Sequence, residues 1–127
     1  MCDNKFYLCE KCGNIVGIIN NSGVPMMCCG QKMIKLEAGV VEASHEKHIP
    51  VVAVEGNTVR VSVGSVTHPM SEEHHIAWVY LQTNRGGQRK CLDYTAAPEV
   101  TFALVDETPV AVYAYCNLHG LWKADIQ

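Results

Sequence analysis

The sequence predicts an all-β protein in which a small cysteine-rich module precedes an antiparallel β-sandwich. Three observations predict this fold class: short runs with apolar residues at alternate positions, turn signals between these runs, and no convincing helical period over ten residues. The chain has 127 residues, of which 48% are hydrophobic and 18% are charged, a balance typical of a globular protein. This length suits one ordinary domain together with a small module.

The cysteine-rich module occupies the start of the chain. Four closely spaced cysteines lie there, on either side of the polar turn NNSGVP: Cys9, Cys12, Cys28 and Cys29. A piece of this size buries too little apolar surface to fold unaided, so the module is expected to need a metal ion. Because the cysteine-rich character stops around LEAGV, we place the boundary between a first domain, residues 1–37, and a second domain, residues 38–127.

The spacing of the four cysteines indicates a sulfur-ligated metal site. In CEKCG, one turn presents the sulfur atoms of Cys9 and Cys12 to one ion, and Gly13 lets the backbone fold back. Tetrahedral sites of this kind suit zinc or iron. The adjacent residues Cys28 and Cys29 must splay to reach one ion, which distorts the tetrahedron. Spacing alone leaves open whether the metal only staples the module or also carries electrons.

From residue 40 onward the pattern is that of β-strands. TVRVSVG alternates strictly, with its three valines on one face, and together with VVAV and the turn EGN it makes a first hairpin. IAWVYLQT and a strand that begins near Gln88 flank NRGG, residues 84–87, in a second hairpin. VTFALV and VAVYAYC supply two more strands, on either side of DETP. Six or seven short strands with turns this close predict an antiparallel sandwich of about 90 residues.

The histidines indicate a second metal site, since several of them accompany a cysteine in one β-domain. All six follow residue 44: His45, His48, His68, His74, His75 and His119. Extended backbone points neighbouring residues to opposite faces, so only one of His74 and His75 should be a ligand, and the sequence leaves open which. His45 and His48 also fall on opposite faces of an extended chain. His48 is the better placed, because Ile49-Pro50 leads from it into an apolar strand.

The remaining candidate ligands lie in two loops. His68 precedes Pro69, which biases it to an extended conformation. Cys116 and His119 complete the set through the turn Asn117-Leu118. The backbone amides of this turn are expected to bond to the thiolate and tune it.

Two chemistries use cysteine together with histidines. Blue-copper proteins combine one cysteine and two histidines with a weak methionine ligand. The segment HGLWKADIQ, however, has no methionine after His119. Four imidazoles and a thiolate instead suit iron with a sixth position open, because a bound thiolate pushes electron density toward the opposite ligand.

Four motifs closely resemble those of the desulfoferrodoxin family, the two-iron form of superoxide reductase, and they cover nearly the whole chain. They are CEKCG…CCG, HEKHIP, GSVTHPMSEEHHIAW and YCNLHGLWKA. The resemblance implies a desulforedoxin-like domain with one iron, followed by an immunoglobulin-like sandwich with a second. The ligands implied for the first iron are Cys9, Cys12, Cys28 and Cys29. The ligands implied for the second iron are His48, His68, His74 and His119 in the equatorial positions and Cys116 in the axial one. The other histidines and cysteines are expected to be non-ligands: His45, His75, Cys91 and Cys2.

The resemblance also implies an activity: superoxide, one electron and two protons give hydrogen peroxide, and no dioxygen forms. Lys47 is implied to attract the anionic substrate and to help deliver protons through water, and Glu46 to occupy the vacant position once the iron is ferric. A solvated Glu-Lys pair before a strand is the plainer interpretation of these two residues. The family further implies rubredoxin or a similar small redox protein as electron donor, and a homodimer paired through its N-terminal domains.

The composition of the chain indicates its compartment and argues against some functions. The formal net charge of −3, with no basic run longer than RK, argues against nucleic-acid binding. No window approaches the ~20 apolar residues of a bilayer span and no signal-peptide pattern is present, so we expect a cytoplasmic protein without membrane attachment. In that reducing compartment, seven cysteines indicate metal ligands or reactive thiols rather than disulfides. Two rival functions remain. One is a pure electron carrier with rubredoxin-like iron and a copper-like or closed second site, and the other is a zinc-stapled interaction module.

Overall fold

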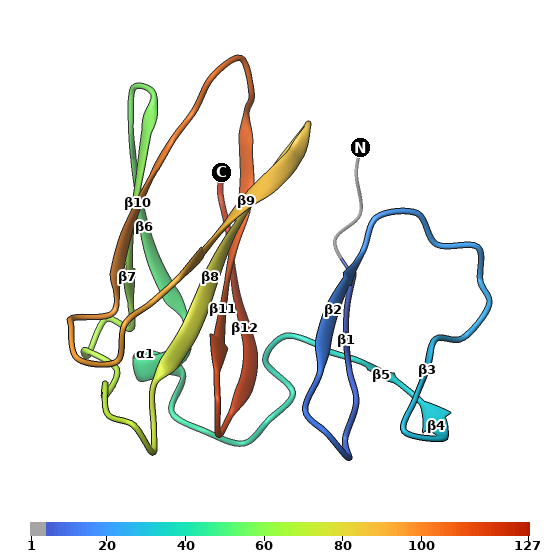
Figure 1. Ribbon diagram of the computed structural model, residues 1–127. Helices are drawn as coiled ribbons and strands as arrows, with labels where there is room; N and C mark the ends of the chain where they lie inside the picture. The colour runs from blue at the N-terminus through green and yellow to red at the C-terminus, as the bar shows by residue number, and fades with distance from the viewer. Residues whose placement is uncertain (1–4) are drawn as a thin grey trace.

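The computed structural model describes residues 5–127, so Cys2 lies outside the described residues. Within them the chain forms twelve strands and one helical turn, arranged as a small module beside a larger two-sheet body (Figure 1). All strand pairs among the described residues are antiparallel. The predicted fold class, a small all-β module followed by an antiparallel β-sandwich, is confirmed.

The N-terminal module is built from very short strands. Three of them form a sheet in the order β2-β1-β5, and β3 pairs with β4 in a separate small hairpin. The strands are β1 (Lys5–Leu8), β2 (Ile15–Ile18), β3 (Met27–Cys28), β4 (Gln31–Lys32) and β5 (Ile34–Lys35). Among residues 5–44, only Phe6 and Cys9 are buried. So small a core agrees with the expectation that this module needs a metal ion.

The second part of the chain is a sandwich of two sheets. One sheet has the order β10-β7-β6 and the other the order β12-β11-β8-β9. The strands are β6 (Pro50–Glu55), β7 (Thr58–Val63), β8 (Ile76–Thr83), β9 (Gly86–Cys91), β10 (Glu99–Ala103), β11 (Pro109–Cys116) and β12 (Gly120–Asp125). These seven strands agree with the six or seven predicted from the sequence.

The hydrophobic core lies between the two sheets. Strand β7 points Val59, Val61 and Val63 inward, each at most 2% exposed, so the predicted alternation is confirmed. Phe102 of β10 and Leu81 of β8 are fully buried in the same cluster. Burial of this apolar surface is the main source of stability, and it fixes the strand ends that carry the second set of candidate ligands.

Two details of the predicted strands are wrong. The second hairpin turns at Asn84-Arg85 alone, because β9 already begins at Gly86, where a φ of 114° lets the chain enter the strand. The turn after Cys116 leads into a further strand, β12, which pairs with β11. Leu121 and Trp122 are neighbours in β12 and both are buried, so the strand lacks the alternation that would have predicted it.

An aromatic cluster attaches the module to the sandwich. The ring centroid of Phe6 lies 5.1 Å from that of Trp78, 5.3 Å from Tyr80 and 6.0 Å from Tyr113. Tilted and edge-to-face pairs of this kind add to the stabilisation from buried area. Strand β1 therefore packs on the face of the β8–β11 pair that is turned away from the main core.

Residues 36–44 connect the two parts. Leu36 N donates to Phe6 O in the module, and Gly39 N donates to Leu121 O in the sandwich, both at 2.8 Å. The boundary that we place between residues 37 and 38 falls in this connection and stays a prediction.

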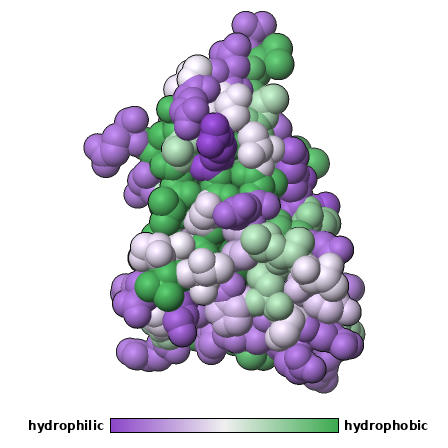
Figure 2. Space-filling view, turned by 90° about the vertical axis from the view of Figure 1, so that its left-hand side faces the viewer, coloured by the Kyte–Doolittle hydropathy of each residue, from purple (hydrophilic) through white to green (hydrophobic). Residues whose placement is uncertain are grey.

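The side of the molecule that carries β6, β7 and β10 mixes apolar and polar side chains (Figure 2). On β6, Val51 is 47% and Val54 is 44% exposed, while Arg60 of β7 pairs with Glu55 at 3.3 Å. Within residues 5–127, no helix is long and apolar enough to cross a membrane.

Candidate metal centres

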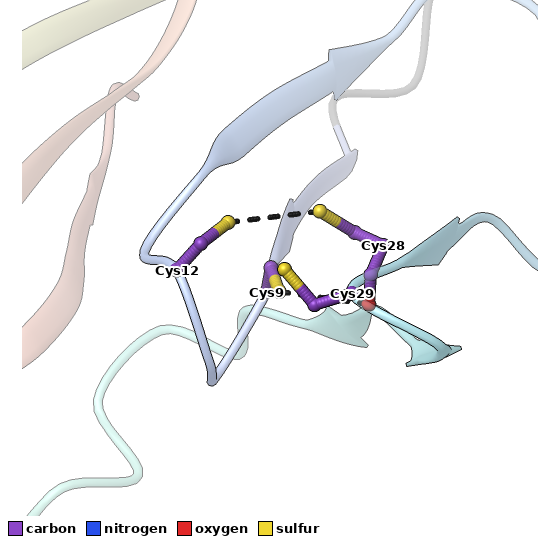
Figure 3. A group of neighbouring side chains, drawn as sticks. All are labelled: Cys9, Cys12, Cys28 and Cys29. Atoms are coloured by element: carbon purple, nitrogen blue, oxygen red, sulfur yellow. Dashed lines mark hydrogen bonds between the residues drawn. The ribbon is translucent and has the colours of Figure 1, made fainter.

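The four cysteine side chains of the module converge (Figure 3). Their sulfur atoms all lie within 4.8 Å of one another, and the Sγ atoms of Cys12 and Cys28 are 3.6 Å apart. A tetrahedral ion with metal–sulfur bonds of ~2.3 Å requires sulfur–sulfur separations of about 3.8 Å. The four sulfur atoms therefore fit one ion.

Backbone conformation lets the adjacent cysteines share one site. Cys29 has a φ of 51° and Gly30 a φ of 74°, in the left-handed region that residues other than glycine seldom adopt. This turns the chain so that the side chains of Cys28 and Cys29 approach the same point. Gly13, with a φ of 83°, donates from its N to Cys9 O at 2.8 Å, which is the fold-back expected after CEKC.

The electrostatics of the four thiols favour a bound cation. The backbone N–H groups of Cys12 and Lys11 lower the pKa of Cys9 to about 6, so this thiolate forms readily. Interaction with Cys12, Cys9 and Cys28 raises the pKa of Cys29 to about 12, and the same crowding raises the pKa of Cys28. One negative charge among converging sulfur atoms opposes the next, and a metal cation removes that opposition.

The second cluster lies at one end of the sandwich, beside the helical turn α1 (His45–His48) (Figure 1). Helix α1 supplies His48, and the β7–β8 connection supplies His68 and His74. Cys116 ends strand β11, and His119 lies in the β11–β12 turn. The ligand atoms of all of these except His119 lie within 4.8 Å of one another. His119 joins them, because its Nδ1 lies 3.1 Å from His48 Nε2 and 3.8 Å from Cys116 Sγ.

The four imidazole rings form a square. Centroid distances along its sides are 4.6 Å for His48–His68, 4.7 Å for His68–His74, 5.0 Å for His74–His119 and 4.9 Å for His119–His48. Neighbouring rings are nearly perpendicular, at 78° to 86°. Metal–nitrogen bonds of ~2.1 Å at right angles put adjacent nitrogens about 3.0 Å apart. Since His48 Nε2 lies 3.1 Å from both His68 Nε2 and His119 Nδ1, the square has the dimensions of a four-nitrogen equatorial site.

Hydrogen bonds fix which ring nitrogens face the centre of the square. Nδ1 of His48 lies 2.7 Å from Ser44 O, and Nδ1 of His68 lies 2.7 Å from Pro69 O. A carbonyl oxygen only accepts, so both Nδ1 atoms carry the proton and both Nε2 atoms present lone pairs, which face each other at 3.1 Å. The buried Nε2 of His74 has no hydrogen-bond partner among residues 5–127. A cation between the rings would satisfy all three nitrogens.

Burial keeps three of the imidazoles in the form that binds metals. Removal from water lowers the pKa of His48 and His74 below the usual value, and lowers that of His68 to about 4. These rings are therefore neutral near neutral pH, with a lone pair available.

The sulfur of Cys116 is fully buried, and this burial raises the pKa of its thiol. Backbone N–H groups of Leu118 and His119 donate to the sulfur and oppose the rise. The expected bond from Leu118 is thus confirmed. The expected bond from Asn117 is wrong, because Asn117 N instead donates to His75 O at 3.1 Å.

The argument that preferred His48 to His45 is wrong in its premise, although His48 does lie in the cluster. Residues 45–48 form a helical turn, not an extended chain, and positions three apart on a helix lie on the same side. His45 is nevertheless outside the square: it is exposed, and its ring packs edge-on against Trp122 at 5.4 Å.

The structure also separates His74 from His75. The ring of His75 lies 5.6 Å from Tyr94, away from the square, and its Nδ1 lies 2.8 Å from Ser71 O. Cys91, in the edge strand β9, is exposed and belongs to neither cluster.

Glu46 and Lys47 are exposed on α1, in the turn that also carries His48. Burial is the main cause of the lowered pKa of His48 and His74, and the positive charge of Lys47 is one of the smaller causes. This charge is therefore felt at the imidazole square.

Trp122 is a residue of this centre that the sequence reasoning missed. It is 1% exposed, its Nε1 donates to His119 O at 3.0 Å, and its ring lies 4.9 Å from that of His48. It therefore supports two neighbouring corners of the square, His48 and His119. The available signal was its position, three residues after His119 in HGLW.

Comparison with known proteins identifies the family. The model of the desulfoferrodoxin family matches residues 40–125, and that of the desulfoferrodoxin N-terminal domain matches residues 3–36. The desulfoferrodoxin of Syntrophotalea carbinolica is 42% identical over 121 residues, and that of Nitratidesulfovibrio vulgaris is 40% identical over 121 residues. Each match covers 95% of this chain and 95% of the relative.

Solved structures agree with this result. The superoxide reductase from Treponema pallidum is 43% identical and superposes with a TM-score of 0.82, covering 97% of this chain and 99% of the other. The one-iron superoxide reductase from Giardia intestinalis, 29% identical, covers 65% of this chain and 98% of its own, with a TM-score of 0.56. From its two family matches and its full-length relatives, the chain belongs to the desulfoferrodoxin family.

Proposed function

We propose that this chain is a superoxide reductase, which converts superoxide to hydrogen peroxide with one electron and two protons and without releasing dioxygen. The observation that carries the proposal is the square of four imidazoles beside the buried sulfur of Cys116. Relatives of the chain are named superoxide reductases. The cofactor is iron, with two ions per chain, one in each cluster.

The donor atoms of both clusters suit iron. The first centre offers the four sulfurs of Cys9, Cys12, Cys28 and Cys29, and the second offers nitrogens of His48, His68, His74 and His119 with the sulfur of Cys116. Iron held in the second centre would supply the electron for the reaction, and the sulfur of Cys116 among its ligands would favour donation of that electron. The protein holds the imidazoles neutral and keeps the sulfur away from water.

Lys47 guides the substrate. Its ammonium group is exposed, it lies in the same helical turn as His48, and its charge is felt at His48 and His74. A positive charge at the mouth of a site raises the local concentration of an anion such as superoxide and speeds its capture. From the same place, Lys47 assists proton delivery through water.

Glu46 assists product release. It is the exposed neighbour of Lys47 on α1, and a carboxylate is a good ligand for ferric iron. Glu46 would bind the oxidised iron in place of peroxide, which would release the product and close the centre to other anions.

The remaining parts of the proposal concern partners and compartment. A rubredoxin or similar small redox protein returns an electron to the oxidised centre, since each turnover consumes one. The chain acts as a homodimer in the cytoplasm, where reducing conditions keep the cysteine ligands available for metal.

The test begins with metal analysis of protein expressed with iron available, which should give two irons per chain. The reduced protein should then consume superoxide and form one peroxide per superoxide, with no dioxygen. Two irons without reaction with superoxide would indicate an electron carrier. Dioxygen release would indicate dismutation, and zinc or copper in the histidine cluster would end the proposal.

A further inference from the structure

The central strand pair of the larger sheet ends in the same way at both ends. Asn117 directly follows β11, and Asn84 directly follows β8. Asn117 N donates to His75 O at 3.1 Å, and His75 N donates to Asn117 Oδ1 at 2.8 Å. At the opposite end, Asn84 N donates to Thr108 O at 3.0 Å, and Thr108 N donates to Asn84 Oδ1 at 2.8 Å.

In both pairs the asparagine side chain replaces its own backbone carbonyl as the acceptor. An ordinary antiparallel pair would exchange two backbone bonds, which would hold both strands in extended form. With Oδ1 as the acceptor, the backbone of the asparagine can turn away while the ladder gains one more pair. At Asn117 the chain uses this freedom to turn, so that the N–H groups of Leu118 and His119 reach the sulfur of Cys116.

Asn117 also makes a third hydrogen bond, from Nδ2 to Glu73 O at 2.9 Å. Its bonds to residues 73 and 75 bracket His74, whose own N is held by Ser71 Oγ at 3.2 Å. Asn117 itself lies between Cys116 and His119 in the sequence. One side chain thus ties the loop that carries one candidate ligand to the turn that carries two others.

We propose that Asn117 is a positioning residue of the second metal centre, which sets His74 against Cys116 and His119 and keeps His75 turned outward. The backbone of His75 is fixed at both its N–H and its C=O by Asn117. Because the backbone on both sides of His74 is held in this way, the ring of His74 stays in the square while the ring of His75 lies against Tyr94. The spacing of His74 and His75 leaves open which of them faces the metal centre. Asn117, which follows the neighbouring strand of the sheet, decides between them.

Asn84 is the matched control, because it makes the same two ladder bonds at the end of the strand pair remote from the metal centre. The experiment compares N117A with N84A in the iron-loaded, full-length protein. The readouts are competition with a chelator for the second iron and the thiolate-to-iron charge-transfer band of the oxidised protein. Both variants lose the bond to Oδ1 and should lose thermal stability, and N117A should lose more, since it also loses the bond to Glu73 O.

Only N117A should affect the iron. Loss of a residue that orients metal ligands weakens metal binding by about 10- to 100-fold, and we expect a weakening in this range together with a shift of the charge-transfer band. If N84A weakens iron binding as much, or if N117A loses stability but keeps the affinity and the band of the wild type, Asn117 is only a structural residue and the proposal is overturned.

A second pair of variants decides the matter if N117A does not load with iron. N117D keeps an oxygen acceptor for His75 N but replaces the donor to Glu73 O with a second oxygen. It should shift the charge-transfer band and weaken iron binding, whereas N84D should do neither, and equal effects would overturn the proposal. The inference rests on the iron centre of the proposed function, not on superoxide turnover. If the wild-type protein binds iron but does not reduce superoxide, the proposed function is wrong, and the inference about Asn117 is unaffected.

Discussion

The attachment of the N-terminal module to the sandwich depends on Phe6, and Phe6→Ala should weaken it without disturbing the second metal centre. Phe6 is 8% exposed and packs on Trp78, Tyr80 and Tyr113. The chain has one other phenylalanine, Phe102, which is fully buried in the core of the sandwich. Phe102→Ala is therefore the control that damages the sandwich itself.

The expected magnitude follows from the surroundings of each ring. Replacing a buried phenylalanine by alanine costs about 3–5 kcal/mol. Phe6 borders an open groove of about 560 Å³, together with Trp78 and Tyr80, so the lower end of this range applies. A loss of about 3 kcal/mol lowers the docking equilibrium constant of the module by about 100-fold. Phe102 has no open side, so about 4 kcal/mol should be lost from the free energy of unfolding of the sandwich.

Two assays separate these effects. Proteolysis within residues 36–44 reports the undocked population, because cleavage tracks the open form when opening and closing are fast. Urea unfolding, followed by the charge-transfer band of the second iron, reports the sandwich. Phe6→Ala should speed cleavage up to about 100-fold and leave the urea midpoint near that of the wild type, whereas Phe102→Ala should lower the midpoint. A midpoint that falls equally in both variants, or unchanged cleavage in Phe6→Ala, would refute the reasoning.

Four further predictions concern single side chains. Lys47→Gln should slow superoxide capture and flatten its dependence on ionic strength, measured by pulse radiolysis; an unchanged rate would remove Lys47 from the mechanism. Glu46→Ala should tighten azide binding to the oxidised protein in a spectroscopic titration, and equal affinity would show that Glu46 does not close the site. Gly64→Ala should lower the free energy of unfolding, measured in urea, by at least about 2 kcal/mol. Gly64 has a φ of +88°, and a Cβ added there would lie 2.7 Å and 2.9 Å from the backbone carbonyl oxygens of residues 47 and 46. Hydrogen bonds from the backbone N–H and the hydroxyl of Thr95 lower the pKa of Asp93 below its usual 3.8, so the ionised carboxylate stabilises the fold at neutral pH. This stabilisation is lost as the pH falls through the lowered pKa, so Asp93→Asn should be less stable than the wild type at pH 7. A difference in urea midpoint between the two proteins that does not narrow in acid would contradict this.

Much of the fold follows from short-range patterns in the sequence. The valines of β7 alternate, and the two-residue turn at Gly56-Asn57 joins it to β6, so this hairpin could be predicted. Strand β12 could not, because Leu121 and Trp122 are both buried against different neighbours, Leu121 in the cluster under the module and Trp122 beside the histidines. An alternating pattern reports burial on one face only, and β12 is covered on both.

The candidate ligands could be found from residue type, but their arrangement could not. The preference for His48 assumed extended chain where the structure has a helical turn, and only the resemblance to a family assigned His74 over His75. In the structure, that choice depends on Asn117, which is 42 residues away from His75 in the sequence. A hydrogen bond between residues on neighbouring strands leaves no periodic pattern in the sequence, so it could not be predicted from residue spacing.

The two centres differ in what holds their ligands, and we therefore expect their metals to contribute differently to folding. In the module only Cys9 is fully buried, Cys12 and Cys29 are exposed, and little apolar core surrounds them. The binding free energy of that metal is therefore largely folding free energy, and its removal should unfold the module. In the second centre, His68 and Cys116 are at most 1% exposed and lie against the hydrophobic core of the sandwich. That core and the hydrogen bonds from the Nδ1 atoms of His48 and His68 hold the ligands in place. A centre fixed in this way can keep its geometry while the charge on its metal changes, which an electron-transferring site requires.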